Sequence, residues 1–123
     1  MRRDGQETGA GGRTDGAARL DGVRRARGFV GRAIGWMGRR RPPAAGLWIE
    51  PCGSIHTCFM RFPIDAAFLA ADGRVLRVCR GLRPWRFVVG PRGARAVLET
   101  AAGRMPEAAS AAGRRVAPPG APE

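Results

Sequence analysis

Short apolar runs separated by turn-forming residues recur along the chain from residue 46 to residue 100. Their spacing of roughly ten residues is typical of a small β-barrel or sandwich. Asp72-Gly73 lies between two runs and predicts a tight hairpin, because glycine accepts positive φ without steric cost. A short helix is expected over Met105–Ala112. The sequence therefore predicts a mainly β fold, a small β-barrel or sandwich of short, mostly antiparallel strands with one or two short helices. The expected strands cover residues 46–50, 55–61, 66–70, 74–80, 86–89 and 94–100.

The N-terminal part differs in composition. Residues 1–22 are glycine-rich and polar, and we expect them to be a disordered basic leader. Residues 23–39 carry a faint helical stripe of apolar side chains interrupted by glycines, which predicts a marginal amphipathic segment that flanks the core. A single β-rich domain is expected over residues 40–117, followed by a disordered tail over residues 118–123.

The charge is strongly positive but unevenly placed. The chain of 123 residues has a formal net charge of +12, and all 22 basic residues are arginine. Lysine, asparagine and tyrosine are absent, a pattern typical of strongly GC-biased coding. Residues 1–45 carry 11 arginines against 4 acidic residues, whereas residues 46–103 carry 8 against 4. We therefore expect only weak, non-specific contact with nucleic acid or an anionic membrane, through residues 23–41.

The cysteines and the N-terminal residues indicate the cellular compartment in which we expect the protein. Cys52, Cys58 and Cys79 form no Cys-x-x-Cys pair and leave one over if two are joined, which favours a reducing environment. Polar residues follow Met1 where a secretory signal would place an apolar segment, and no run reaches the length of a membrane span. We expect a soluble cytoplasmic protein with no transmembrane segment.

The segment from Cys52 to Asp65 gathers the single histidine, two cysteines, a methionine and an acid, so a site is expected here. In a regular strand, His56, Cys58 and Met60 project from one face. Imidazole, thiolate and thioether together suit a soft ion such as Cu(I). Their spacing along a strand is too wide for one ion unless the strand bends. We therefore expect no metal and no cofactor, with the cysteine and the methionine as core residues.

Acid–base chemistry is a second possibility for this segment. Asp65 lies two residues after Pro63 and could pair with Arg61, with His56 or Glu99 nearby. An acid, a base and a cation on one rim would make a conceivable catalytic site. The alternative, which we favour, is that these charged pairs only hold the ends of the strands together.

Binding without catalysis is the third possibility. Trp85 stands between Pro84 and Arg86 in a loop-like stretch, where an exposed aromatic side chain marks a binding surface. Arg61 or Arg86 could meet an anionic ligand in a shallow pocket. The alternative, which we favour, is a tryptophan packed over the end of a small barrel. The aromatic residues that could line the pocket are Trp48, His56, Phe62 and Trp85.

An ordered series of short motifs runs from residue 46 to residue 103. Its members are Gly46-Leu47-Trp48-Ile49, Pro51-Cys52, Ser54-Ile55-His56, Met60-Arg61-Phe62-Pro63-Ile64-Asp65, Phe68-Leu69, Asp72-Gly73-Arg74-Val75, Pro84-Trp85-Arg86, Val97-Leu98-Glu99 and Ala102-Gly103. This series resembles the domain of unknown function 192 family, small β-rich proteins of bacteria and archaea. The resemblance implies the fold and the motif positions but no reaction, because the family has no established activity. Family members usually close with a Gly-Asp pair, where this chain has Gly113-Arg114.

These observations favour a non-enzymatic binding or accessory module for an unknown small anionic ligand or protein partner. The alternative is an enzyme of unknown reaction with a site centred on His56, Asp65 and Glu99. A cleft that joins these residues would favour a ligand or substrate, whereas a histidine sealed in a filled interior would favour a structural role. The candidate ligand-binding residues are His56, Met60, Arg61, Asp65, Trp85 and Glu99.

Overall fold

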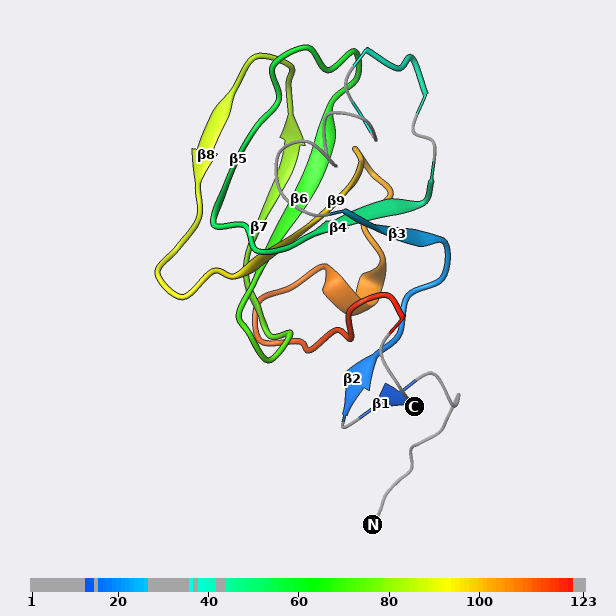
Figure 1. Ribbon diagram of the computed structural model, residues 1–123, viewed down its shortest axis with the longest axis vertical. Helices are drawn as coiled ribbons and strands as arrows, with labels where there is room; N and C mark the ends of the chain where they lie inside the picture. The colour runs from blue at the N-terminus through cyan, green and yellow to red at the C-terminus, as the bar shows by residue number, and fades with distance from the viewer. Residues whose placement is uncertain (1–12, 15, 27–35, 37, 42–43, 121–123) are drawn as a thin grey trace.

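The computed structural model describes residues 13, 14, 16–26, 36, 38–41 and 44–120. Its main feature is a five-stranded sheet with the strand order β3-β4-β9-β6-β7 (Figure 1). β3 is parallel to β4, and the other neighbouring strands are antiparallel. The strands are β3 (Val23–Ala26), β4 (Gly46–Ile49), β6 (Ile64–Leu69), β7 (Val75–Leu82) and β9 (Ala96–Ala101).

Two smaller sheets complete the strand content. β5 (Ser54–His56) pairs with β8 (Phe87–Val89), and β1 (Arg13–Thr14) pairs with β2 (Ala17–Ala18), both antiparallel. Ile55 and Val88 of the β5–β8 pair pack into the core of the main sheet. The predicted mainly β, mostly antiparallel fold is confirmed, as layered sheets.

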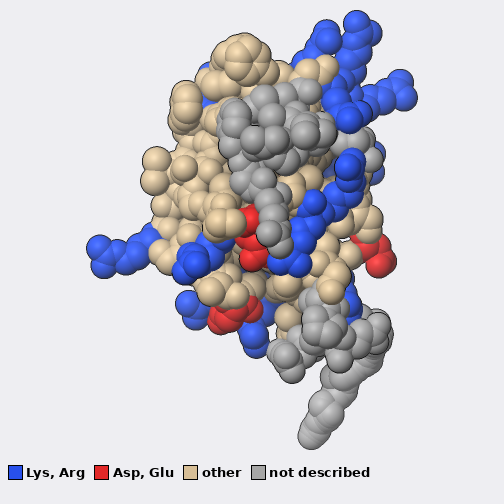
Figure 2. Space-filling view, viewed as in Figure 1, with Lys and Arg blue, Asp and Glu red and all other residues tan. Residues whose placement is uncertain are grey.

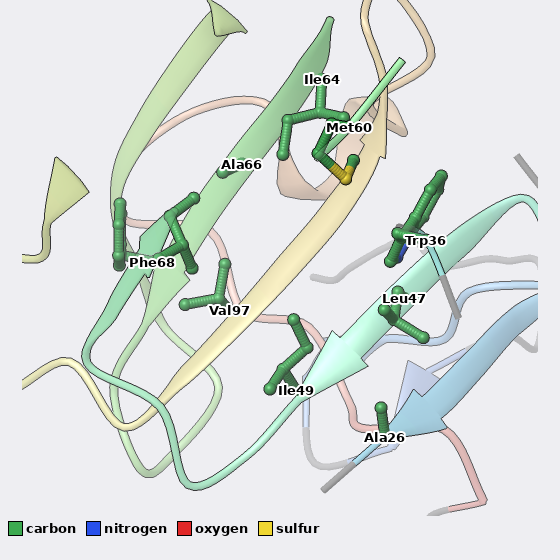
Figure 3. Packing of buried hydrophobic residues seen from close by; sticks show 10 residues of the cluster. Ala26, Trp36, Leu47, Ile49, Met60, Ile64, Ala66, Phe68 and Val97 are labelled. Atoms are coloured by element: carbon green, nitrogen blue, oxygen red, sulfur yellow. The ribbon is translucent and has the colours of Figure 1, made fainter. Parts of the chain in front are cut away.

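Apolar residues alternate along the central strands and build a core on each face of the main sheet. On β4, Leu47 and Ile49 belong to one cluster and Trp48 belongs to the other. On β9, Val97 and Leu98 divide in the same way, as expected for a strand buried on both faces. We name the two faces the β5–β8 side and the C-terminal side, after the segments that cover them. Figure 3 shows the β5–β8 side.

The β5–β8 side is closed by aromatic packing and by one close backbone approach. Trp36 is buried and packs against Phe62 with 5.4 Å between ring centroids. At Gly90, which follows β8, a Cβ atom would lie 2.6 Å from the Gly53 carbonyl oxygen and 2.6 Å from the Phe68 ring. A side chain at position 90 would therefore push the β5–β8 layer away from the main sheet.

The C-terminal side is closed by residues that follow β9. A single-turn 3₁₀ helix (Glu107–Ala109) and Val116 pack there. The Val116 N–H donates to the Gly73 carbonyl at 2.9 Å, and the Val75 N–H donates to the Arg114 carbonyl at 2.7 Å. The C-terminal segment is thereby joined to the β6–β7 turn, where the predicted Asp-Gly hairpin is confirmed.

The start of the fold differs from the sequence expectation. Val23–Ala26 is a strand paired in parallel with β4, so the helix expected from residue 23 is wrong at these positions. Val23 packs against the C-terminal side and Ala26 against the β5–β8 side, so this segment contacts the cores on both faces of the sheet. These contacts and the pairing with β4 favour a strand over the helix that the apolar pattern predicted. Residues 27–35 and 37, where the rest of that helix was expected, lie outside the described residues.

Part of the expected leader is also built into the fold. Ala17 is buried, and the Ala18 N–H donates to the Arg115 carbonyl at 3.0 Å. Leu20 packs against the C-terminal side. The described fold therefore begins before residue 22, whereas residues 1–12 and 15 lie outside the described residues.

Two expected elements are shorter than predicted. The strand expected over residues 55–61 ends at His56, because Phe59 has φ of 66° and the Met60 N–H turns back to the Thr57 carbonyl. The helix expected over residues 105–112 is the single 3₁₀ turn at Glu107–Ala109.

We predict that Gly73→Ala destabilises the fold more than Gly113→Ala. Both glycines have positive φ, but a Cβ atom at Gly73 would lie 2.2 Å from the Val116 carbonyl oxygen, whereas one at Gly113 would meet nothing within 4 Å. The clash should add about 1–3 kcal/mol to the backbone strain that both variants share. Urea unfolding measures the difference, and equal losses in the two variants would refute the close approach.

Candidate functional site

Asp65 is a buried carboxylate that binds the backbone. Its Oδ1 accepts the Gly81 N–H at 2.8 Å and its Oδ2 accepts the Gly103 N–H at 3.0 Å. It thereby joins the end of β7 to the turn after β9. The expected pair with Arg61 is not made, and Arg61 is exposed. Both carboxylate oxygens thus have structural partners.

Met60 and Glu99 lie inside the molecule. Met60 belongs to the core of the β5–β8 side, where Figure 3 places it near Ile64. Glu99 is fully buried on β9. It is paired with Ala66 of β6, so its side chain faces the β5–β8 side, and Asp65 faces the opposite side. The sheet therefore separates the two carboxylates, and the acid pair expected for an enzyme site is not brought together.

His56 lies at the end of β5 and is partly exposed. Its Nδ1 accepts the Cys58 N–H at 3.2 Å, which makes this nitrogen an acceptor. The ring lies 5.9 Å from the Phe87 ring on the paired strand. His56 therefore belongs to the outer face of the β5–β8 pair, away from Asp65.

Trp85 is exposed and is not packed over the end of a barrel, and it has an aromatic partner. Its ring centroid lies 4.7 Å from that of Phe59, and the two planes are tilted by 59°. Both residues have φ of 66°, the left-handed region that bulky side chains rarely adopt. Residues held in this region against their preference gather at binding and catalytic sites.

Thr57 holds the backbone beneath this pair. Its Oγ1 donates to the Arg83 carbonyl at 2.6 Å and accepts the Arg86 N–H at 2.8 Å. Its carbonyl accepts the Trp85 N–H at 3.0 Å. The buried threonine thus joins the turn that carries Phe59 to the loop that carries Trp85.

An exposed apolar surface results, which we name the aromatic face: His56, Phe59, Trp85, Phe87 and Val89. Exposed fractions are 61% for Phe59, 58% for Trp85, 78% for Phe87 and 77% for Val89. These four are the exposed large hydrophobic residues of the described part of the chain. Their gathering on one small sheet and its adjoining turns distinguishes this face from a surface with scattered apolar residues.

The charges around the aromatic face are all positive. Residues 51–63 and 83–94, which form this layer and its loops, contain four arginines and no acidic residue. Arg61, Arg83 and Arg86 are exposed. Figure 2 shows the region over β5 and β8 as mainly uncharged, with acidic atoms elsewhere. The electrostatic potential therefore favours anionic groups.

The expected site residues thus divide into two groups. His56, Arg61 and Trp85 lie on the β5–β8 layer or its loops, whereas Met60, Asp65 and Glu99 are buried. Trp48 lies on the C-terminal side and cannot join Trp85 in one pocket. Thr57, Phe59, Phe87 and Val89 also contribute, and none of them was expected as a site residue from the sequence. A usable signal was the run of three apolar residues Phe87-Val88-Val89. Because the side chains of a strand alternate between its two faces, a strand that buries Val88 leaves Phe87 and Val89 exposed.

Neither a metal site nor a membrane span is found in the described residues. No group of three or more His, Cys, Asp or Glu side chains there could hold a metal ion. No helix in those ranges is long and apolar enough to cross a membrane. The cysteines form no disulfide with one another. Most of residues 27–41, part of the segment expected to contact nucleic acid or membrane, is not described.

The fold and its surface define a small mainly β domain with layered sheets and an exposed aromatic face. The DUF192 family, described as "Uncharacterized ACR", matches residues 13–118, and the chain belongs to this family. UPF0127 protein PF1050 of Pyrococcus furiosus is 35% identical over 82 residues, covering 63% of this chain and 69% of that protein.

Two solved structures share the fold. A protein described provisionally as a transcription regulator, from Sinorhizobium meliloti 1021, has a TM-score of 0.64 at 24% identity, covering 76% of this chain and 78% of its own. A protein of unknown function from Novosphingobium aromaticivorans has a TM-score of 0.57 at 22% identity, covering 66% of this chain and 63% of its own. This chain thus spans less than two thirds of the Novosphingobium protein.

We predict that Asp65→Asn destabilises the protein by about 1–3 kcal/mol, because an amide cannot accept both the Gly81 and the Gly103 N–H. Asp72→Asn is the matched control: among the described residues this exposed carboxylate accepts only the Arg74 N–H, at 3.0 Å, which an amide oxygen also accepts. The control should change stability by less than about 0.5 kcal/mol. Denaturant unfolding of both variants measures this, and a neutral Asp65→Asn would contradict the structural role.

We predict that Thr57→Val destabilises the protein by about 1–3 kcal/mol, because it leaves the Arg86 N–H and the Arg83 carbonyl without their hydroxyl partner. Thr57→Ser keeps the hydroxyl and loses only a methyl group, about 0.8 kcal/mol. Unfolding free energies, with amide hydrogen exchange at Arg86 as a local readout, separate the two. Equal behaviour of valine and serine would contradict the role of the hydroxyl group.

Proposed function

We propose that this protein is a non-enzymatic binding module whose aromatic face docks an extended acidic segment of a partner protein. The observation that carries the proposal is the gathering of four exposed large apolar side chains on one layer. Aromatic residues and arginine are the side chains that most often dominate binding energy at protein interfaces. The alternative, an enzyme with a site at Asp65 and Glu99, has no comparable support, because the sheet separates these two carboxylates.

The exposed edge of β8 supports an extended partner. The Arg86 carbonyl and the Gly90 N–H, on either side of β8, bond to Thr57 and Gly53 next to β5. In an antiparallel ladder the alternate residues, here Phe87 and Val89, direct their backbone groups to the opposite edge. Figure 1 places β8 at the margin of the molecule. A peptide strand could pair with this edge and lay apolar side chains on the aromatic face.

The charge supports an acidic segment. Four arginines and no acid in residues 51–63 and 83–94 would attract carboxylates and repel a basic peptide. Arg83 and Arg86 flank Trp85 on the loop that Thr57 holds. Carboxylates placed between apolar residues of a strand would therefore meet arginine at the rim of the face.

We also propose a cytoplasmic location for this module. The three cysteines lie partly exposed without a disulfide among the described residues, which fits a reducing compartment.

We predict that a synthetic peptide alternating valine and glutamate binds the protein, and that its valine–lysine counterpart does not. Phe87→Ala and Trp85→Ala should each weaken binding about tenfold, the effect of losing an interface anchor. Fluorescence anisotropy of the labelled peptides at low salt measures the affinities. Slower amide exchange at Phe87 and Val89 in the complex would report strand pairing.

The controls distinguish binding at the aromatic face from a general effect of the positive charge of the protein. Arg83→Gln with Arg86→Gln should weaken binding, whereas the equally charged control Arg77→Gln with Arg104→Gln should not. Equal losses in both double variants, or no effect of Phe87→Ala, would overturn the proposal. Tighter binding of oligothymidylate than of the acidic peptide, lost in the same aromatic variants, would identify a nucleic-acid platform instead.

A further inference from the structure

A trough lies on the C-terminal side of the main sheet, away from the aromatic face. It consists of two adjoining cavities of about 230 Å³ and about 410 Å³, which share Glu50, Ala71 and Arg95 in their walls. Trp48 of β4 and the C-terminal Ala117 and Pro118 line the smaller cavity. Concave sites with mainly apolar walls and a few polar groups are the usual places for small ligands.

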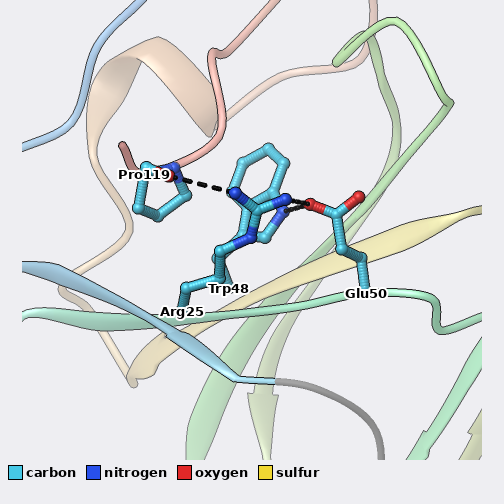
Figure 4. A network of polar contacts seen from close by, with 4 residues as sticks. All are labelled: Arg25, Trp48, Glu50 and Pro119. Atoms are coloured by element: carbon cyan, nitrogen blue, oxygen red, sulfur yellow. Dashed lines mark hydrogen bonds and ion pairs between the residues drawn. The ribbon is translucent and has the colours of Figure 1, made fainter. Parts of the chain in front are cut away.

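A polar network holds one end of the trough. Glu50 Oε1 accepts the Trp48 indole N–H at 2.8 Å and an Arg25 N–H at 2.7 Å. The other Arg25 nitrogen donates to the Pro119 carbonyl at 3.4 Å. Figure 4 shows the guanidinium between the C-terminal segment and the carboxylate, with the indole beside them. The network fixes the Trp48 ring and neutralises the Glu50 charge.

Arg95 provides a guanidinium group that takes no part in this network. It precedes β9, and its backbone is fixed, because its N–H donates to the Leu69 carbonyl and its carbonyl accepts the Cys52 N–H. Its side chain is exposed, and the guanidinium makes no hydrogen bond or ion pair with the described residues. A guanidinium anchored in this way can bind a carboxylate or phosphate in bidentate geometry.

We propose that this trough binds a small organic anion, with the apolar body of the ligand against Trp48, Ala71 and Ala117 and its carboxylate or phosphate paired with Arg95. A cationic ligand fits less well, because Glu50 already has Arg25 as its counter-ion. Asp72 at the rim accepts the Arg74 N–H. This site is independent of the aromatic face and uses none of its residues.

Benzoate is a suitable probe, because it joins one carboxylate to a flat apolar ring, and benzamide is its uncharged counterpart. We predict that benzoate binds the full chain, and that Arg95→Gln weakens binding about fivefold to tenfold, the effect of one charge-assisted pair at an exposed site. The matched control Arg92→Gln removes an exposed arginine that lines neither cavity and should leave the affinity unchanged. Ligand-observed NMR titration measures the affinities.

A second variant tests the cavity apart from the charge. Ala71→Phe would fill the space shared by the two cavities from an exposed turn and should abolish benzoate binding while Arg95 remains. Undetectable binding of benzoate to the native chain, equal losses in the Arg92 and Arg95 variants, or benzamide binding as tightly as benzoate would each overturn the site. Phe87→Ala should leave benzoate binding unchanged, so failure here is distinguishable from failure of the aromatic face as a docking surface.

Discussion

The burial of β9 on both faces is the constraint on which the rest of the structure depends. β9 pairs with β4 on one edge and β6 on the other, and consecutive residues Val97 and Leu98 enter different cores. Each face of the sheet therefore needs a cover of its own. The β5–β8 layer covers one face, and the C-terminal segment covers the other. The aromatic face lies on the first cover and the trough lies beside the second, so both depend on the alternation of β9 side chains between the two cores.

The aromatic face is maintained against local preference. A left-handed backbone at an L-residue costs about 1–2 kcal/mol, and both Phe59 and Trp85 adopt it. Their large exposed surfaces recover little hydrophobic energy beyond their mutual contact. The hydrogen bonds of Thr57 to the loop that carries Trp85 offset part of this strain. A backbone whose conformation is fixed in advance loses less entropy when a partner binds, which suits a docking surface.

The sequence predicted the parts of the fold that local chemistry determines. Strand alternation and the Asp72-Gly73 turn were sufficient to locate β4, β6, β7 and β9 to within a few residues. The end of β5 at His56 was missed because it depends on Trp85, almost thirty residues away, bonding to Thr57. Val23–Ala26 was misjudged because its strand form requires β4 as a neighbour. The sequence grouped Asp65 with His56 because the two are close along the chain. It could not show that the Asp65 side chain faces the C-terminal side of the sheet, where it accepts the Gly81 and Gly103 N–H groups.

The distribution of acids, more than the number of arginines, gives the charge a functional meaning. Residues 46–103 contain four acidic residues. Asp65 and Glu99 are buried, and Glu50 is paired with Arg25. Of these four acids, Asp72 alone is exposed without an arginine partner among the described residues, and it lines the trough. The β5–β8 layer is therefore more positive than the net charge of this region implies. GC-biased coding explains abundant arginine, but it does not explain why carboxylates are withdrawn from the surface that carries the exposed aromatic residues.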